Sequence, residues 1–171
     1  SQWLLITLGS PRFIGRAIFS AVPAASSLCI GGGAEGSPLS SALQERAWHT
    51  VAFVLDGSEG MAPSVRGTVE SVSLVQELMR LSLGPRLLFV TAGAQQPTTL
   101  AASGAGASQG GVWGLARVVR TEQPSLRVRV VTADMSSLVS GAGLSELLGE
   151  SSGSEPELAW SADGSRFVSR L

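Results

Sequence analysis

The stretch from residue 109 to residue 124, QGGVWGLARVVRTEQP, carries the strongest structural signal in this chain. Its apolar residues follow the spacing i, i+3, i+4 and i+7, which stacks side chains on one face of a helix; these residues are Val112, Leu115, Ala116 and Val119. Trp113, Arg117 and Arg120 fall on the other face. The stretch therefore predicts an amphipathic helix with an aromatic and basic face opposite its buried face.

Both ends of this helix are marked in the sequence. Gly110 and Gly111 allow a close approach of the backbone to neighbouring structure, and Pro124 cannot continue a helix. Apolar and charged residues then alternate from Leu126 to Val130, which is typical of a β-strand. A bounded helix followed at once by a strand is the expected local structure.

Apolar runs upstream of this segment predict buried strands. A run without alternation suits a strand that is covered on both faces of a parallel sheet. The runs are Trp3 to Leu8, Ser27 to Gly31, Thr50 to Asp56 and Arg86 to Thr91. Residues 65–81 predict a helix, with Ser64 as its N-cap and Gly84 as its stop. The apolar side of that helix is expected to consist of Val65, Val69, Val72, Val75, Leu78 and Met79.

Strands that alternate with helices form right-handed βαβ units and a parallel sheet covered by helices. We therefore expect an α/β fold, a truncated Rossmann-like parallel sheet flanked by helices. Two short apolar segments near the end flank Asp163 and Gly164, a pair favoured in tight hairpins because both positions tolerate positive φ. A length of 171 residues suits a single domain, 1–171, ending in a β-hairpin over 156–171. Loops are expected at 101–108 and 151–155.

The composition excludes several classes of function. The twelve basic residues are all arginine and scattered, and the net charge is −1, so we expect neither a nucleic-acid nor a membrane-binding surface. Charged residues make up 15% of the chain, against roughly 25% in a typical soluble domain. A partner that covers part of the surface and a simple compositional bias both explain this shortfall.

Cysteine usage and hydropathy indicate which kinds of site and which location in the cell to expect. Cys29 is the single cysteine, which excludes a disulfide framework and a thiolate zinc site, and in its apolar run it is expected to behave as a small hydrophobe. No apolar run reaches the ~18 to 20 residues that span a bilayer, and no signal peptide pattern is present. We expect a cytoplasmic protein, and a location inside an organelle stays open as an alternative. The ends of the sequence suggest that the chain is a piece of a longer one.

Three segments resemble one family in the same order. They are the helix at 109–124 with its following strand, LVQELMRLSLGPRLLFVTAGAQ at 74–95, and PELAWSADGSRFVSRL at 156–171. Together they resemble the N-terminal, non-catalytic structural subdomain of ketoreductase domains from type I modular polyketide synthases, in the short-chain dehydrogenase/reductase superfamily. The resemblance covers residues 64–171, whereas residues 1–60 agree only in their strand rhythm.

The resemblance implies a structural role. In this family the ketoreductase domain contains two copies of the fold, and the truncated first copy supports the second, which carries NADPH and the catalytic Ser, Tyr, Lys and Asn. The whole domain would reduce a β-keto group on a chain bound to an acyl carrier protein. This chain has no Tyr, Lys or Asn, so we expect no catalytic residue, cofactor or metal in it. Two alternatives stay open: an independent interaction module, and a small nucleotide-binding reductase.

The turn after the first strand is the obvious place for a nucleotide. The superfamily pattern Gly-x-x-x-Gly-x-Gly meets Gly9, Phe13 and Gly15 here, so the middle glycine is a phenylalanine. The backbone of such a turn must approach the pyrophosphate closely at a helix N-terminus. A phenylalanine adds bulk and removes access to positive φ, and we expect no phosphate binding.

Other candidates for chemistry have simpler explanations. His49 is the only histidine and no G-x-S-x-G motif occurs, so a packed or surface histidine is favoured over a triad. Asp56 and Asp134 end apolar strands, where carboxylates bind ligands but more often cap turns. The residues Thr91 to Gly93 resemble the Asn-Ala-Gly turn of active members, and without the Asn they are expected to form a strand-ending turn.

The aromatic and basic helix face is the remaining candidate. Trp and Arg are enriched at binding hot spots, and residues of both types stand at these positions in the family's motif. We therefore predict that Trp113, Arg117 and Arg120 form a docking surface for the catalytic half, with a solvated helix face as the alternative.

Overall fold

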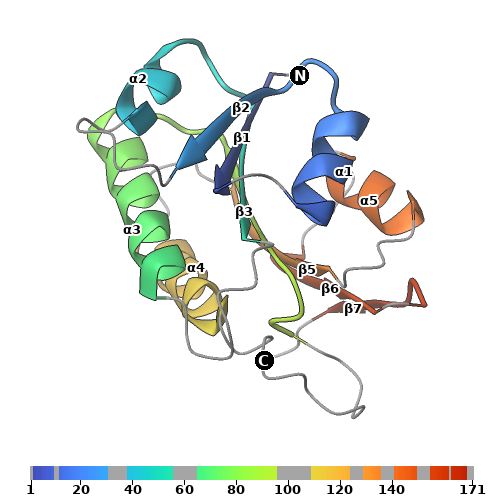
Figure 1. Ribbon diagram of the computed structural model, residues 1–171. Helices are drawn as coiled ribbons and strands as arrows, with labels where there is room; N and C mark the ends of the chain where they lie inside the picture. The colour runs from blue at the N-terminus through green and yellow to red at the C-terminus, as the bar shows by residue number, and fades with distance from the viewer. Residues whose placement is uncertain are drawn as a thin grey trace.

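The computed structural model describes residues 2–9, 12–30, 38–55, 65–95, 109–123, 129–135, 141–149, 155–161 and 163–168. A seven-stranded sheet runs through the molecule, and helices cover both of its faces (Figure 1). The strands are β1 (Trp3–Leu8), β2 (Ser26–Ile30), β3 (Thr50–Leu55), β4 (Arg86–Thr91), β5 (Arg129–Met135), β6 (Glu157–Trp160) and β7 (Arg166–Val168). The helices are α1 (Phe13–Ala21), α2 (Pro38–Gln44), α3 (Val65–Arg80), α4 (Gly110–Glu122) and α5 (Gly141–Leu148).

The sheet is parallel except at its last strand. Its order is β2-β1-β3-β4-β5-β6-β7, so the chain winds outward from β1 in one direction and then from β3 in the other. All neighbouring pairs up to β5–β6 are parallel, and only β6–β7 is antiparallel. This is the doubly wound arrangement of Rossmann-like folds, and it confirms the predicted fold class.

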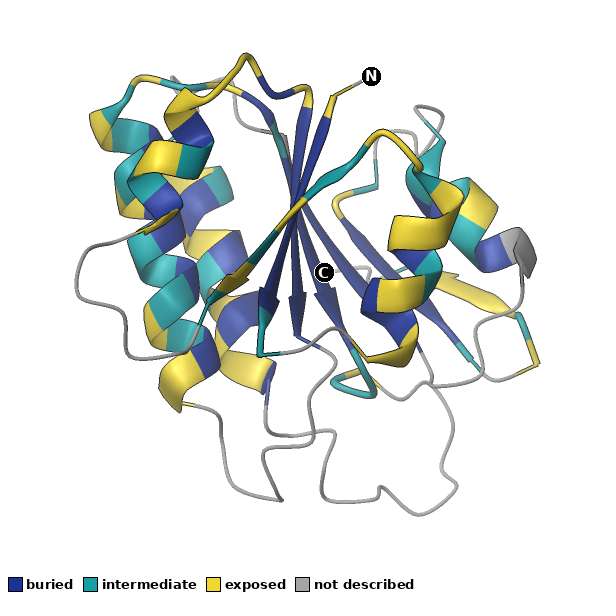
Figure 2. Ribbon diagram, turned by 45° about the horizontal axis from the view of Figure 1, so that its top comes forward, coloured by how far each residue is buried: buried dark blue, intermediate teal, exposed yellow. Residues whose placement is uncertain are grey.

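Two hydrophobic cores lie on the two faces of the sheet. One packs the sheet against α2, α3 and α4, and the other packs it against α1 and α5. Figure 2 shows the central strands dark blue between the two helical layers. Residues of β1, β3 and β4 are buried nearly throughout because both sides of these strands meet a core, which explains their uninterrupted apolar sequences.

Helix α3 differs from its prediction at both ends. The helix ends at Arg80, and Ser82 rather than Gly84 takes the left-handed conformation, with φ 53°. Ser64 lies outside the described residues. At the start of the helix, Val65 and Val69 are 74% and 55% exposed. The predicted apolar side is therefore wrong in the first turns of the helix, where these two valines face solvent.

The terminal hairpin is confirmed, with one correction to its turn. Gly164 has φ 85°, whereas Asp163 does not adopt positive φ. The carboxylate of Asp163 instead accepts hydrogen bonds from the Ser165 N–H, at 2.9 Å, and from the Ser161 hydroxyl. The aspartate thus forms the turn through its side chain. The βαβ rhythm also continues one strand further than expected, because β6 is parallel to β5.

Strand β5 begins later than predicted. It runs from Arg129 to Met135, and residues 130–135 are buried without alternation because β5 lies between β4 and β6. The expected strand residues 126–128 and the loops expected at 101–108 and 151–154 lie outside the described residues. Among the described helices, none has the length and apolar character needed to cross a bilayer.

Candidate functional site

The carboxyl ends of the parallel strands form the edge where open α/β sheets bind ligands. At this edge β1 ends in a turn at Gly9, whose N–H donates to the Ile30 carbonyl at 3.0 Å. Phe13 is the first residue of α1 and is 78% exposed, while Gly15 is buried in the same helix. The N-cap residue, Arg12, makes no side-chain capping bond.

The prediction that this turn binds no dinucleotide rests on the side chains present and stays a prediction. A pyrophosphate needs a turn whose backbone is accessible at the helix N-terminus, and here the middle glycine of the pattern is Phe13. Phe13 has helical conformation, so only the bulk of its side chain, and not the loss of a positive φ, opposes the approach of a pyrophosphate. No lysine exists in the chain to hold a ribose.

A buried carboxylate organises the neighbouring turn. Asp134, at the end of β5, accepts hydrogen bonds through Oδ1 from the Ala94 N–H (2.8 Å) and the Thr91 hydroxyl (2.6 Å). Its Oδ2 accepts from the Gln95 N–H at 2.8 Å. Burial raises the pKa of Asp134 above its ordinary value, although these hydrogen bonds act in the opposite direction. Asp134 is therefore a turn former, and Thr91 to Gly93 form the expected strand-ending turn.

Trp113 belongs to the same network. Its indole N–H donates to the Thr91 hydroxyl oxygen at 3.1 Å, and the residue is 3% exposed. The prediction that Trp113 lies on the face away from the core is therefore wrong. The helical spacing missed it because the first turn of α4 lies beside the end of β4, where the indole reaches the hydroxyl of Thr91.

The two predicted arginines meet at a second buried carboxylate. Glu157 on β6 is almost wholly buried. Arg117 donates to its two oxygens through Nε and Nη2, both at 2.7 Å. Arg120 donates to the Glu157 Oε1 and reaches the carbonyl of Val130 at 3.4 Å. These bonds fasten the middle of α4 to strands β5 and β6.

The two arginines differ in their surroundings. The hydrogen bond to Glu157 raises the pKa of Arg117, which is partly exposed. Burial lowers the pKa of the more enclosed Arg120, against the attraction of Glu157. Both groups stay cationic, because arginine does not deprotonate in proteins. Their docking role stays a prediction, and within the chain they form a clamp.

Sequence reasoning missed Glu157 as the partner of the two arginines, and it identified Thr91 only as part of a strand-ending turn. A signal for Glu157 was present, since a carboxylate within an otherwise apolar strand is rarely buried without a cationic partner. His49 is exposed, with Nδ1 3.1 Å from the Thr50 hydroxyl oxygen. Cys29 is also exposed, not packed as expected. Asp56 lies outside the described residues.

Helices α3 and α4 each carry apolar side chains that are exposed to solvent. They pack closely, because a Cβ at Gly111 would lie 2.6 Å from the hydroxyl oxygen of Thr68. Gly110, in contrast, has open space around it, so the predicted close approach holds for one glycine of the pair. Val65 and Val69 on α3 and Val118 on α4, which is 49% exposed, are solvent-facing. We call these three residues the valine surface.

One family of known sequences matches most of the chain. Residues 15–171 match the family described as the Rossmann fold domain of polyketide synthase extender module SpnB. A C2-type ketoreductase from a modular polyketide synthase shares 26% identity and superposes with a TM-score of 0.72, covering 96% of this chain and 39% of that one. None of the curated protein sequences compared with the chain matches it.

Other solved structures show the same fold. An A-type ketoreductase from a modular polyketide synthase has a TM-score of 0.76 at 23% identity, covering 96% of this chain and 37% of that one. A short-chain dehydrogenase from Burkholderia cenocepacia J2315, solved with NADP, has a TM-score of 0.61 at 12% identity, covering 91% of this chain and 86% of that one. The chain thus spans less than half the length of the two ketoreductases.

Proposed function

The chain belongs to the Rossmann fold domain family of polyketide synthase extender modules, and from this premise we propose that it is the structural, non-catalytic subdomain of a ketoreductase domain. It shares 26% identity with a polyketide synthase ketoreductase while covering 39% of that chain. On this proposal the remainder of the domain supplies the reaction, which is NADPH-dependent reduction of a β-keto group on a chain bound to an acyl carrier protein.

The observation that carries the proposal is the set of hydrogen bonds at the carboxyl edge of the sheet. There the oxygens of Asp134 accept bonds from the chain's own backbone and from Thr91, and the indole N–H of Trp113 donates to Thr91. A carboxylate used in this way holds a turn, and most of its acceptor sites are taken by the chain itself. The superfamily's reaction also requires a tyrosine and a lysine, and the sequence contains neither.

The exposure of the valine surface supports the proposal that a partner binds to helices α3 and α4. Three branched apolar side chains are each about half exposed or more on two neighbouring helices, although burying a valine contributes roughly 1.5–3 kcal/mol. Arg117, whose guanidinium is partly exposed beyond its bond to Glu157, lies on the same helix as Val118. We propose that the catalytic subdomain of the same polypeptide docks here, and that Trp113 supports the surface from inside.

The experiment expresses this chain and the remainder of its ketoreductase as separate polypeptides. The chain alone should show no saturable NADPH binding and no reduction of β-keto thioesters, because the turn at Phe13 does not fit a pyrophosphate. Mixed with the catalytic part, it should form a complex and raise that part's thermal midpoint and activity. Saturable binding of NADPH to the chain alone in the low micromolar range, a binding free energy of roughly −8 kcal/mol, would support the alternative that the chain is a nucleotide-binding reductase.

Charge substitutions test the docking surface separately. Val69→Asp and Val118→Asp should leave the melting curve of the chain nearly unchanged, since both side chains already face water, but weaken the complex about tenfold or more. Ser20→Asp, an exposed change on α1 in the opposite helical layer, is the matched control. Equal affinity of all three variants would place the catalytic subdomain elsewhere.

A further inference from the structure

Strand β2 forms one edge of the sheet and has hydrogen-bonding groups that face outward. Its Ile30 carbonyl accepts from the Gly9 N–H at 3.0 Å, so the backbone groups of Ile30 face β1. Alternate residues of a parallel strand direct their backbone groups to opposite sides. The N–H and C=O groups of Ser27 and Cys29 therefore point away from the sheet, and in the described part of the chain no strand lies beyond them (Figure 1).

This edge lacks the features that usually prevent pairing with another strand. Edge strands are commonly protected by charged side chains, proline or a bulge. The sequence of β2 is SSLCI, which has no charge and no proline, and its register with β1 is regular from Ser26 to Ile30. The opposite edge of the sheet differs, because β7 begins with Arg166, which pairs with Glu146.

We propose that β2 pairs antiparallel with the β2 strand of a second copy of this chain, with Leu28 at the two-fold axis. In an antiparallel pair, residues whose backbone groups face the partner exchange both hydrogen bonds. Centring on Leu28 places Ser27 opposite Cys29 of the partner, and Cys29 opposite Ser27 of the partner. The two outward residues thus satisfy each other, and the interface is self-complementary, as a two-fold dimer requires.

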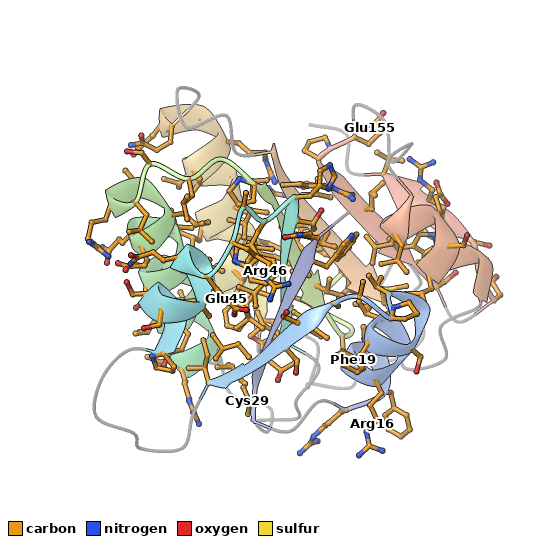
Figure 3. The ribbon with its side chains drawn as sticks, turned by 90° about the horizontal axis from the view of Figure 1, so that it is seen from above. Arg16, Phe19, Cys29, Glu45, Arg46 and Glu155 are labelled. Atoms are coloured by element: carbon orange, nitrogen blue, oxygen red, sulfur yellow. The ribbon has the colours of Figure 1, made fainter. Side chains whose placement is uncertain are left out.

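The surroundings of β2 favour the β2 strand of a second copy as the partner. Leu28 and Ile30 pack toward the core beneath α2, so the side chains of Ser27 and Cys29 lie on the face that carries α1. On that helix Phe19 is 44% exposed, and Figure 3 shows Phe19 and Cys29 on the same side of the molecule. A two-fold axis perpendicular to the sheet brings both α1 helices to one face, where the phenyl rings would flank the paired strands.

The proposal does not rest on the proposed ketoreductase role. A second copy of β2 is favoured over an unrelated extended segment because spacing and symmetry are set by this chain alone. Pairing of two uncharged strands also involves no charge repulsion, whereas like charges directly opposite each other would destabilise it. Two sheets would join into one continuous sheet across the axis.

A disulfide trap tests the register. Residues at position 28 would face each other in a non-hydrogen-bonded pair, with Cα atoms about 4.5 Å apart, which lies within the usual disulfide range of roughly 4.4–6.8 Å. Leu28→Cys in a Cys29→Ser background, which has no other cysteine, should give a covalent dimer on mild oxidation. Ile30→Cys in the same background should stay monomeric, because residues 30 of the two copies would be far apart.

Light scattering tests the assembly without a covalent bond. The unmodified 171-residue chain should be dimeric at about 100 μM, and Cys29→Lys should make it monomeric by placing a charge on the edge. Gln76→Lys, exposed on α3, should stay dimeric. Circular dichroism shows whether each variant is folded. A monomeric unmodified chain, a Cys29→Lys chain that stays dimeric, or equal crosslinking of the two cysteine variants would overturn the proposal.

Discussion

Two buried carboxylates on neighbouring strands, Asp134 on β5 and Glu157 on β6, have different kinds of partner. Asp134 receives neutral donors: two backbone N–H groups and the hydroxyl of Thr91, which also accepts from Trp113. Glu157 receives the guanidinium groups of Arg117 and Arg120. The first arrangement fixes a turn between elements, and the second connects a helix to a neighbouring strand.

The difference shows how neutral and charged donors act on a buried carboxylate. The neutral donors at Asp134 orient its carboxylate but supply no opposite charge, and burial raises the pKa of Asp134. The arginines at Glu157 supply opposite charge, which a buried carboxylate needs to stay ionised. Asp134 lies near the carboxyl end of β5, where an open α/β sheet has functional groups, whereas Glu157 is the first residue of β6. Both carboxylates accept hydrogen bonds from groups of the chain itself.

Removing the charge of Glu157 should produce the largest loss. Glu157→Gln leaves two guanidinium groups beside a neutral amide, and Arg120 is too enclosed for water to replace the carboxylate fully. Breaking a buried pair costs roughly 3–5 kcal/mol, and the partial exposure of Arg117 places the expected value near the lower end, at about 3 kcal/mol. Urea unfolding measures it.

The matched control for that loss is Glu122→Gln, an exposed carboxylate on the same helix. It should change the free energy of unfolding by less than about 0.5 kcal/mol. If Glu157→Gln also falls below about 1 kcal/mol, the range of surface ion pairs, the clamp does not hold α4 and the comparison with Asp134 fails.

Asp134→Asn should produce an intermediate loss. An amide in this place keeps one oxygen for Ala94 and Thr91, but its NH₂ group then faces the N–H of Gln95, so a buried donor loses its acceptor. Such a group costs roughly 1–3 kcal/mol, and we expect about 2 kcal/mol in the same assay. Asp163→Asn is the control, because the described bonds of Asp163 use one oxygen only and lie in the exposed hairpin. Equal effects of the two substitutions would mean that the turn after β4 does not depend on Asp134.

Much of the fold followed from the sequence because its signals are local. The apolar runs of β1, β3 and β4 gave their strands nearly to the residue, since a strand covered on both faces tolerates few polar side chains. The pair Asp163 and Gly164 located the hairpin, although the aspartate acts through its carboxylate and not through positive φ.

The site followed less well because it depends on contacts between distant segments. Periodicity placed Trp113 on the outer face, but its position is set by the hydroxyl of Thr91, 22 residues earlier. Val65 and Val69 have the helical spacing of buried residues and still face outward, because spacing identifies an apolar side and not what covers it. Arg117 and Arg120 were found, whereas Glu157, 40 residues from Arg117, was not.

The smallest expected effects are in the pH dependence of stability, where two carboxylates should respond with opposite signs. The hydrogen bond from Arg80, with a further one from Ser40, lowers the pKa of Glu77 on α3 to about 2 from its ordinary 4.5. Its contribution is therefore present above pH 4.5 and lost as the pH falls toward about 2. Burial raises the pKa of Asp134 above 3.8, so its native form binds a proton before the unfolded form does, and stability is gained as the pH falls through that window.

Urea unfolding of the unmodified chain, Glu77→Gln and Asp134→Asn between pH 3 and pH 7 separates the two signs. The advantage of the unmodified chain over Glu77→Gln should shrink with acidification, and only slightly, because the ion pair with Arg80 is at the surface and screened by water and salt. The advantage over Asp134→Asn should grow as the pH falls from above the raised pKa toward 3.8. Parallel slopes for the two variants would show that the donors around Asp134, and not its burial, set its pKa. The environment of Asp134 would then be equivalent to an ion pair, and the distinction between Asp134 and Glu157 would be lost.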